Sequence, residues 1–429
     1  MKIRPLYKVW LLCCWLLCGV FARAEKGDTT LGLQFTDYTY KPGIHTVRLY
    51  LEGMELEPPL ITYSGGEQLL LSFDELGTDL QQYNYTYIHC NADWTPSNLS
   101  AYDYLTGFFE GTISNYSLSK ATRLPYVHYQ LNFPNEDLGL NRSGNYLLLV
   151  YANNDTSQRV LSRRFYVVDN KISVDVSLKN AATADLFLSH QEVQFDLNVK
   201  DIAITNPFDE VSVTVMQNFR PDNAYYGLKP QFIRQDKLVY RSDGKIVFPG
   251  LKEFRFFDSR NLLYLGQHIK TYHADSNVVE LNADDIRAYK QYDYIKDANG
   301  AYIVGRNDAR NNNLEAEYVK VRFLLGTKLM FPGSGIYVVG AFNNWQLLDS
   351  CKLDYNFSTK TYSKDVLLKQ GFYNYLYTMV RDGEAADPLA LEGSNYETEN
   401  NYQILVYYRP VGTRYDQLVA FRQINTLNR

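Results

Sequence analysis

Short apolar or alternating segments, bounded by turn residues, recur along the whole chain and constrain its fold more than any other feature. Residues 68–73 (QLLLSF) and 83–88 (YNYTYI) are apolar or alternating, and residues 145–152 (NYLLLVYA) are apolar almost throughout. Segments of this length and composition predict β-strands. Helical periodicity is weak, and residues 284–291 are the one stretch that we interpret as a candidate helix. We therefore predict an all-β fold.

The predicted strands fall into three groups, at residues 25–170, 171–317 and 318–429. A chain of 429 residues fits two to four domains of ~100–200 residues each. We therefore expect three tandem β-sandwiches of the immunoglobulin-like type. The 37 tyrosines and 22 phenylalanines are explained most simply as the aromatic content of β-rich cores.

The N-terminus predicts export. A positively charged segment precedes an apolar run at residues 9–21, and the small-residue site Ala22-Arg23-Ala24 follows. This order predicts a secretory signal peptide over residues 1–24. Acylation at Cys18 is disfavoured, because the preceding Leu17 is not small. Cleavage would remove four cations and no acid, so the formal charge would change from −5 to −9, which argues against a nucleic-acid surface.

The segment His89-Cys90-Asn91-Ala92-Asp93-Trp94 most resembles a catalytic site. A cysteine beside a histidine fits a nucleophile and its base, as in a thiol hydrolase. Neighbouring residues of a strand point to opposite faces, however, so His89 is poorly placed to activate Cys90. We favour a strand end with a buried thiol, followed by a turn. Cys351 belongs to another predicted domain, so no disulfide framework is expected.

Other chemical motifs are weak. The acidic residues Asp382, Glu384 and Asp387 lack the regular ligand spacing of a calcium loop and are interpreted as a solvated loop. A nucleophile elbow, a phosphate-binding glycine loop and an H-E-x-x-H helix are all missing from the sequence. We therefore expect neither an enzyme nor a cofactor.

The last predicted domain has a more specific pattern. Gly340-Ala341-Phe342-Asn343-Asn344-Trp345 resembles the start of starch-binding modules of the early-set immunoglobulin-like type, and residues 369–377 (KQGFYNYLY) fit the same fold. In those modules a tryptophan stacks on sugar rings through its apolar face. Trp345 is therefore a candidate contact for a glycan or a partner protein.

Ordered motifs along most of the chain resemble one family, the type IX secretion system plug proteins, first catalogued as a domain of unknown function. In the N-terminal part these motifs are residues 71–76 (LSFDEL), 87–97 (YIHCNADWTPS), 104–108 (YLTGF) and 143–146 (SGNY). Further along they are residues 217–224 (QNFRPDNA), 253–258 (EFRFFD), 369–375 (KQGFYNY), 397–400 (ETEN) and 406–409 (VYYR).

The resemblance implies a non-enzymatic periplasmic protein of Bacteroidetes. Its partner would be the very large outer-membrane translocon barrel, which it would close from the periplasmic side when idle. It would be membrane-associated only through that barrel, with no nucleic acid and no small-molecule substrate. The family-signature residues are expected to be structural: His89, Cys90, Asp93, Trp94, Gly107, Gly144 and Asn145. The alternative function is a cell-envelope glycan-binding protein that uses Trp345.

Overall fold

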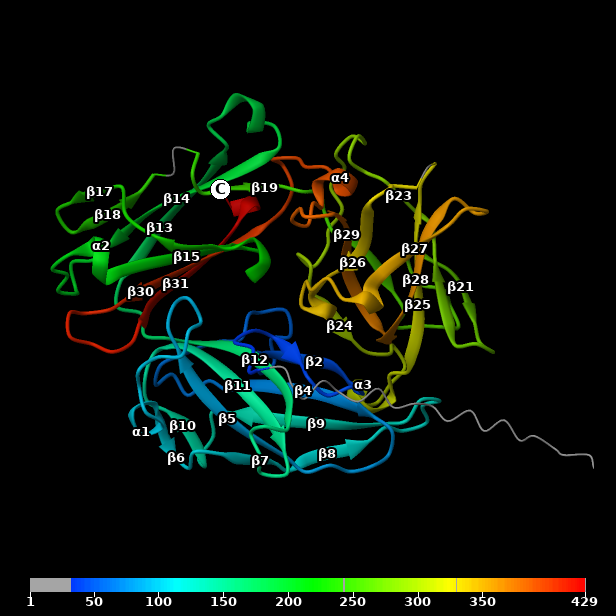
Figure 1. Ribbon diagram of the computed structural model, residues 1–429, viewed down its shortest axis with the longest axis horizontal. Helices are drawn as coiled ribbons and strands as arrows, with labels where there is room; N and C mark the ends of the chain where they lie inside the picture. Colours follow the sequence, from blue (N-terminus) through cyan, green and yellow to red (C-terminus); the bar gives the residue numbers. More distant parts are fainter. Residues whose placement is uncertain (1–31, 242–243, 329, 429) are drawn as a thin grey trace, which may run out of the picture.

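The computed structural model describes residues 32–241, 244–328 and 330–428, which form three lobes built almost entirely of β-strands (Figure 1). This confirms the predicted all-β class of packed sheets. The expected signal peptide at 1–24 lies outside the described residues. Among the described residues, no helix has the length and apolar character needed to cross a membrane. The candidate helix at 284–291 is wrong: it begins with the two-residue strand β23 (Asp284–Asp285) and continues as turn and coil.

The N-terminal lobe is a sandwich of two sheets. Its strands are β1 (Tyr38–Thr39), β2 (Ile44–Leu51), β3 (Leu60–Thr62), β4 (Leu69–Leu76), β5 (Tyr83–Cys90), β6 (Leu105–Gly107), β7 (Gly111–Ile113), β8 (Asn115–Leu118), β9 (Tyr126–Phe133), β10 (Leu138–Leu140), β11 (Gly144–Ala152) and β12 (Arg159–Val168), with the one-turn helix α1 (Ala101–Tyr104). One sheet has the order β1-β12-β11-β5-β7 with β3 beside β12, and the other has the order β2-β4-β9-β8.

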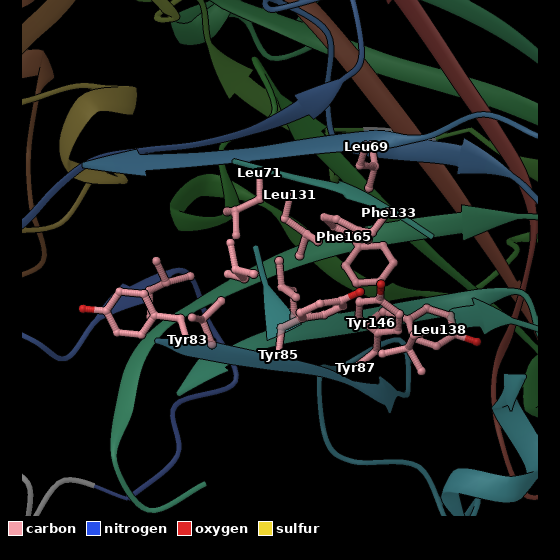
Figure 2. Packing of buried hydrophobic residues seen from close by; sticks show 14 of the residues in the cluster. Leu69, Leu71, Tyr83, Tyr85, Tyr87, Leu131, Phe133, Leu138, Tyr146 and Phe165 are labelled. Atoms are coloured by element: carbon pink, nitrogen blue, oxygen red, sulfur yellow. The ribbon is translucent and has the colours of Figure 1, made fainter. Parts of the chain in front are cut away.

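Tyrosines fill the core between these two sheets (Figure 2). Tyr83, Tyr85 and Tyr87 alternate along β5, so all three point to the same face of the strand. Buried tyrosines need a partner for the hydroxyl, and Tyr83 donates to Glu75 Oε2 at 2.7 Å. The largest fully buried side chains of the described residues are tyrosines, so this residue type serves the cores more than the surface.

Two strands from the C-terminal end of the chain complete the middle lobe. Its strands are β13 (Ser173–Asn180), β14 (His190–Asn198), β15 (Val211–Gln217), β16 (Tyr225–Leu228), β17 (Phe232–Arg234), β18 (Lys237–Tyr240), β19 (Val247–Pro249), β30 (Asn401–Tyr408) and β31 (Gln417–Asn425), with α2 (Pro207–Glu210) and the 3-10 turns at Ala184–Leu186, Pro221–Asn223 and Thr426–Asn428. One sheet has the order β13-β14-β18-β17 with β19 on β14, and the facing sheet has the order β16-β15-β30-β31. In Figure 1 the red C-terminal strands therefore lie beside the green β15.

The third lobe is formed by the chain between β19 and β30. Its strands are β20 (Arg255–Asp258), β21 (Ile269–His273), β22 (Val278–Leu281), β23, β24 (Tyr302–Val304), β25 (Tyr318–Gly326), β26 (Ser334–Val339), β27 (Lys352–Asn356), β28 (Thr361–Lys369) and β29 (Gly371–Arg381), with α3 (Asn312–Glu315), α4 (Leu389–Glu392) and the 3-10 turns at Ala341–Asn343 and Asp349–Cys351. They form one sheet that curves around a shared core, with β20 and β24 beside β29 and with β22 and β23 beside β25.

The expected boundary between residues 317 and 318 does not match these sheets. Strand β20 belongs to the third lobe, because it pairs with β29. Strand β30 belongs to the middle lobe, because it pairs with β15. The third lobe is thus inserted between two parts of the middle lobe. Periodicity predicts that a segment is a strand but carries no information about a partner almost two hundred residues away.

Candidate functional site at the domain junction

The signature segment at residues 89–94 lies where the N-terminal lobe meets the C-terminal strands. It covers the end of β5 and the turn that follows. Cys90 and Trp94 belong to an apolar cluster that also contains Leu405 and Tyr407 of β30. The segment is therefore part of the contact between the N-terminal and middle lobes.

His89 and Cys90 point to opposite faces of β5, as the sequence predicted. His89 packs edge-on against Tyr146 on the inner face, with ring centroids 4.8 Å apart, and donates from Nε2 to the Ser143 carbonyl at 3.2 Å. Cys90 is fully buried in the outer cluster, and burial raises the pKa of its thiol to about 12. A protonated, inaccessible thiol is a poor nucleophile. Cys351 is likewise buried and free.

Asn145 links the two lobes directly. It is the second residue of β11 and lies opposite Cys90, and its side chain is fully buried. Its Nδ2 donates to the Asn91 carbonyl at 3.1 Å, and its Oδ1 accepts from the Tyr407 hydroxyl at 2.8 Å. The side-chain amide of Asn145 thus forms hydrogen bonds both with the turn after β5 and with β30 of the middle lobe.

Residues of the loop between β30 and β31 form hydrogen bonds with the turn that follows β5. Asp416 accepts from the Ala92 main-chain N–H at 2.9 Å and pairs with Arg409 at 2.7 Å. Arg409 also donates to the Asn91 side chain at 2.7 Å. These bonds join residues more than 300 positions apart in the chain.

Asp93 and Trp94 shape the turn itself. Asp93 accepts from the main-chain N–H of Thr95 at 3.0 Å, which is a local turn bond. Trp94 has a left-handed backbone (φ 67°) and packs edge-on against Tyr166, with 5.4 Å between ring centroids. The Arg164 guanidinium covers its ring at 4.2 Å. These contacts give both residues a structural part in the turn.

The two signature glycines occupy places where a side chain would clash. At Gly144 (φ 142°) a Cβ would lie 2.5 Å from His89 Nε2 and 3.1 Å from the Asp416 carbonyl. At Gly107 (φ 87°) it would lie 2.4 Å from the Asp137 carbonyl. Both positions combine a glycine-favouring backbone with close packing.

A second junction joins the N-terminal lobe to the third lobe through a buried charge. Asp74 of β4 accepts from Lys369 at 2.7 Å, from the Tyr318 hydroxyl at 2.7 Å and from His128 Nδ1 at 2.6 Å. The side chains of Asp74 and Lys369 are each 1% exposed. Burial alone would raise the pKa of Asp74, but Lys369 and His128 hold it below its usual value.

The Lys369 ammonium makes two further contacts at this junction. Besides Asp74 it donates to the Asn313 carbonyl at 2.8 Å, and it lies 4.1 Å from the centre of the Tyr126 ring. Asp74 and Lys369 each lie within a family motif, but nothing in the sequence indicates that they form a pair. The sequence signal that could have identified these two residues is a charged side chain within an otherwise apolar strand.

Trp345 lies at a third junction, between the middle and third lobes. Its indole is half-buried, and the Arg220 guanidinium of the middle lobe covers it at 4.2 Å. Phe254 packs beside it, with 5.7 Å between ring centroids. Because Arg220 occupies a face of the ring that a sugar would use, the contacts of Trp345 give the glycan-binding alternative no support.

Two acidic residues of the third-lobe loop pair with one arginine. Arg381 pairs with Glu384 at 3.3 Å and with Asp387 at 3.4 Å. Within the described residues, no group of three or more histidine, cysteine or acidic side chains has the geometry of a metal site. Of the signature residues, His89, Cys90, Trp94 and Asn145 contact the C-terminal strands and the loop between them, whereas Asp93 and Gly107 act within the N-terminal lobe.

Comparisons with known proteins bear on the family and the fold of the chain. Residues 44–169 match the family model of the type 9 secretion system plug protein 1st domain. The crystal structure of a hypothetical protein from Parabacteroides merdae is similar to the chain with a TM-score of 0.87 and 34% identity, covering 92% of this chain and all of that one. None of the curated proteins matches. The chain belongs to the family of type IX secretion system plug proteins.

Proposed function

We propose that this protein is the periplasmic plug of the type IX secretion system. It sits under the periplasmic mouth of the giant outer-membrane barrel and closes the pore while no cargo passes. The match of residues 44–169 to the plug family carries this proposal. The role needs no catalysis, in keeping with a buried Cys90 thiol whose pKa is about 12. The protein reaches the periplasm by means of the expected signal peptide at residues 1–24.

The junctions between the lobes suit such a role. A body that seals a pore wide enough for folded proteins must keep its shape. Buried hydrogen bonds and ion pairs that cross a junction favour one arrangement of the parts that they join. The Asp74–Lys369 pair and the Asn145–Tyr407 bond do this at two of the three junctions.

A permeability experiment tests the proposal. The gene is deleted in a strain that retains the barrel, and growth is measured in the presence of vancomycin, which is too large for ordinary porins. We expect the deletion strain to become sensitive, because an unplugged wide pore admits the drug. Re-expression of the intact protein should restore resistance.

The control is a strain that lacks both the plug and the barrel. Its sensitivity should fall to that of the parent, because the leak requires the pore. Tagged protein purified from native envelopes in mild detergent should also carry the barrel in near-equal amount. Unchanged vancomycin resistance after deletion, or purification without the barrel, would count against the plug role.

A further inference from the structure

A cavity of about 430 Å³ lies where the three lobes meet. Arg48 and Arg163 of the N-terminal lobe, Phe219 of the middle lobe, and Tyr302 and Trp345 of the third lobe all line it. In Figure 1 the strands β2, β12 and β24, which carry three of these residues, face one another at the centre of the molecule. Cavities of this size, with aromatic walls and a few polar groups, are typical of small-ligand sites.

Arg163 is the unusual residue of this cavity. It is 5% exposed, and its hydrogen bonds within the described residues go to main-chain carbonyls, from Nη1 to Ser162 at 2.8 Å and to Tyr38 at 3.3 Å. Buried arginines are normally paired with a carboxylate. The nearby Asp37 is turned to another donor, because its Oδ1 accepts from the Arg164 main-chain N–H at 2.7 Å. Nε and Nη2 of Arg163 thus have no protein acceptor among the described residues.

Two other charged groups of the cavity already have partners. Arg48 pairs with Glu55 at 2.9 Å and donates to the Tyr50 hydroxyl at 3.0 Å. The Asp297 carboxyl is held by the main-chain N–H groups of Phe254 and Asn299, and burial raises its pKa to about 7. Arg164 also lines the cavity, but its guanidinium donates to the Phe35 carbonyl and covers the Trp94 ring. The Arg163 guanidinium is therefore the one with free donors among the described residues, and it has no bonded carboxylate.

Tyr302 adds a second donor from the third lobe. Its hydroxyl lies within electrostatic reach of both Arg48 and Arg163 and makes no hydrogen bond to a described residue. Its ring is held in place by stacking on Tyr373, with 5.1 Å between centroids. A guanidinium and a phenol hydroxyl that face the same space can bind a carboxylate through charge-assisted hydrogen bonds.

We propose that the cavity binds a small carboxylic acid, with its carboxylate against Arg163 and Tyr302 and its apolar body against the aromatic wall. The plug role calls for no such ligand, so this site is a separate property of the chain. Because all three lobes contribute to the lining, an occupant would brace them against one another.

The test uses the full mature protein with benzoate and benzamide as probes, which have the same shape but differ in charge. Binding is followed by ligand-observed NMR and by the shift of the thermal unfolding midpoint. Hydrogen bonds to a charged group are worth roughly 1.5–3 kcal/mol, so benzamide should bind roughly tenfold more weakly or worse. Equal binding of the two probes would overturn the proposal.

Two variants locate the site. Arg163→Gln should weaken benzoate binding roughly tenfold, and Tyr302→Phe, which removes one hydroxyl and leaves the stacked ring, should weaken it roughly threefold to tenfold. Arg234→Gln is the matched control, because Arg234 is an exposed arginine on the edge strand β17. If Arg163→Gln fails to fold, Tyr302→Phe decides the matter alone. Unchanged benzoate binding in the variants that fold, or an equal loss in Arg234→Gln, would overturn the assignment.

Discussion

Asp74 shows how much one side chain contributes to the boundary between two lobes. Its carboxylate lies 2.7 Å from the Lys369 ammonium, and both side chains are almost completely buried. Removing one partner of a buried pair costs roughly 3–5 kcal/mol, because the other charge stays buried without compensation. We therefore expect Asp74→Asn to lower the free energy of unfolding by about 3–5 kcal/mol, measured by urea denaturation.

Asp365 offers a matched control for this prediction. It pairs with Arg322 at 2.7 Å, but on the surface, where its side chain is 34% exposed. Exposed pairs contribute roughly 0–1 kcal/mol, so Asp365→Asn should be close to neutral. If the two variants unfolded at the same urea concentration, the Asp74 network would be no more important than a surface pair.

His89 makes the junction between the N-terminal and middle lobes sensitive to acid. Burial lowers the pKa of its imidazole to about 4, although the Ser143 carbonyl partly opposes this. The unfolded chain has the ordinary pKa near 6.5, so between pH 6.5 and pH 4 it binds a proton that the folded protein does not. The contribution of His89 to stability must then fall as the pH falls through this window, by roughly 3 kcal/mol in total.

A His89→Gln variant tests this contribution. Relative to the parent, its unfolding free energy should rise by roughly 3 kcal/mol as the pH falls from 6.5 to 4, because the variant no longer carries the buried imidazole. The comparison uses the difference between the two proteins, because Asp297, whose pKa is raised to about 7, acts in the opposite direction in both. A difference between the two proteins that stays constant across this window would contradict the assignment.

At the scale of elements, the sequence predicted strands well and their partners poorly. The alternation of Tyr83, Tyr85 and Tyr87 correctly placed one face of β5 against a core. Asn299-Gly300 is a dipeptide that favours a turn and it forms one, with φ of 50° and 87°, but the strand β24 after it pairs with the distant β29. Turn chemistry is local and can be read from a few residues, whereas pairing depends on contacts across the fold.

The candidate site was also predicted only in part: its residues could be identified from the sequence, but their partners could not. Family motifs marked residues 89–94 without revealing what they hold together. Ala92 and its acceptor Asp416 are 324 positions apart, so no local pattern connects them. Arg163 also sits within an ordinary strand sequence, and only the three-dimensional arrangement shows that its guanidinium faces a cavity without a bonded carboxylate.

At the scale of the whole molecule, the insertion of the third lobe changes which pieces of chain can fold alone. The core of the third lobe lies entirely between Phe257 and Leu391. The core of the middle lobe draws on β13 to β19 and also on Tyr402, Ile404 and Val406 of β30. A domain folds independently only when its own hydrophobic core is complete.

Two fragments therefore distinguish the observed division from the one that the sequence predicted. A fragment of residues 251–396 contains the whole third-lobe core and should give dispersed amide NMR signals and a cooperative thermal transition. A fragment of residues 171–317 lacks β30 and β31, half of the sheet β16-β15-β30-β31, so its apolar face has nothing to cover it. It should give the narrow amide dispersion of an unfolded or molten chain.

Adding residues 398–429 through a flexible linker to residues 171–250 should restore dispersion, because the missing strands then return to β15. A folded 171–317 fragment beside an unfolded 251–396 fragment would show that the strand pairing described above does not determine how the chain divides.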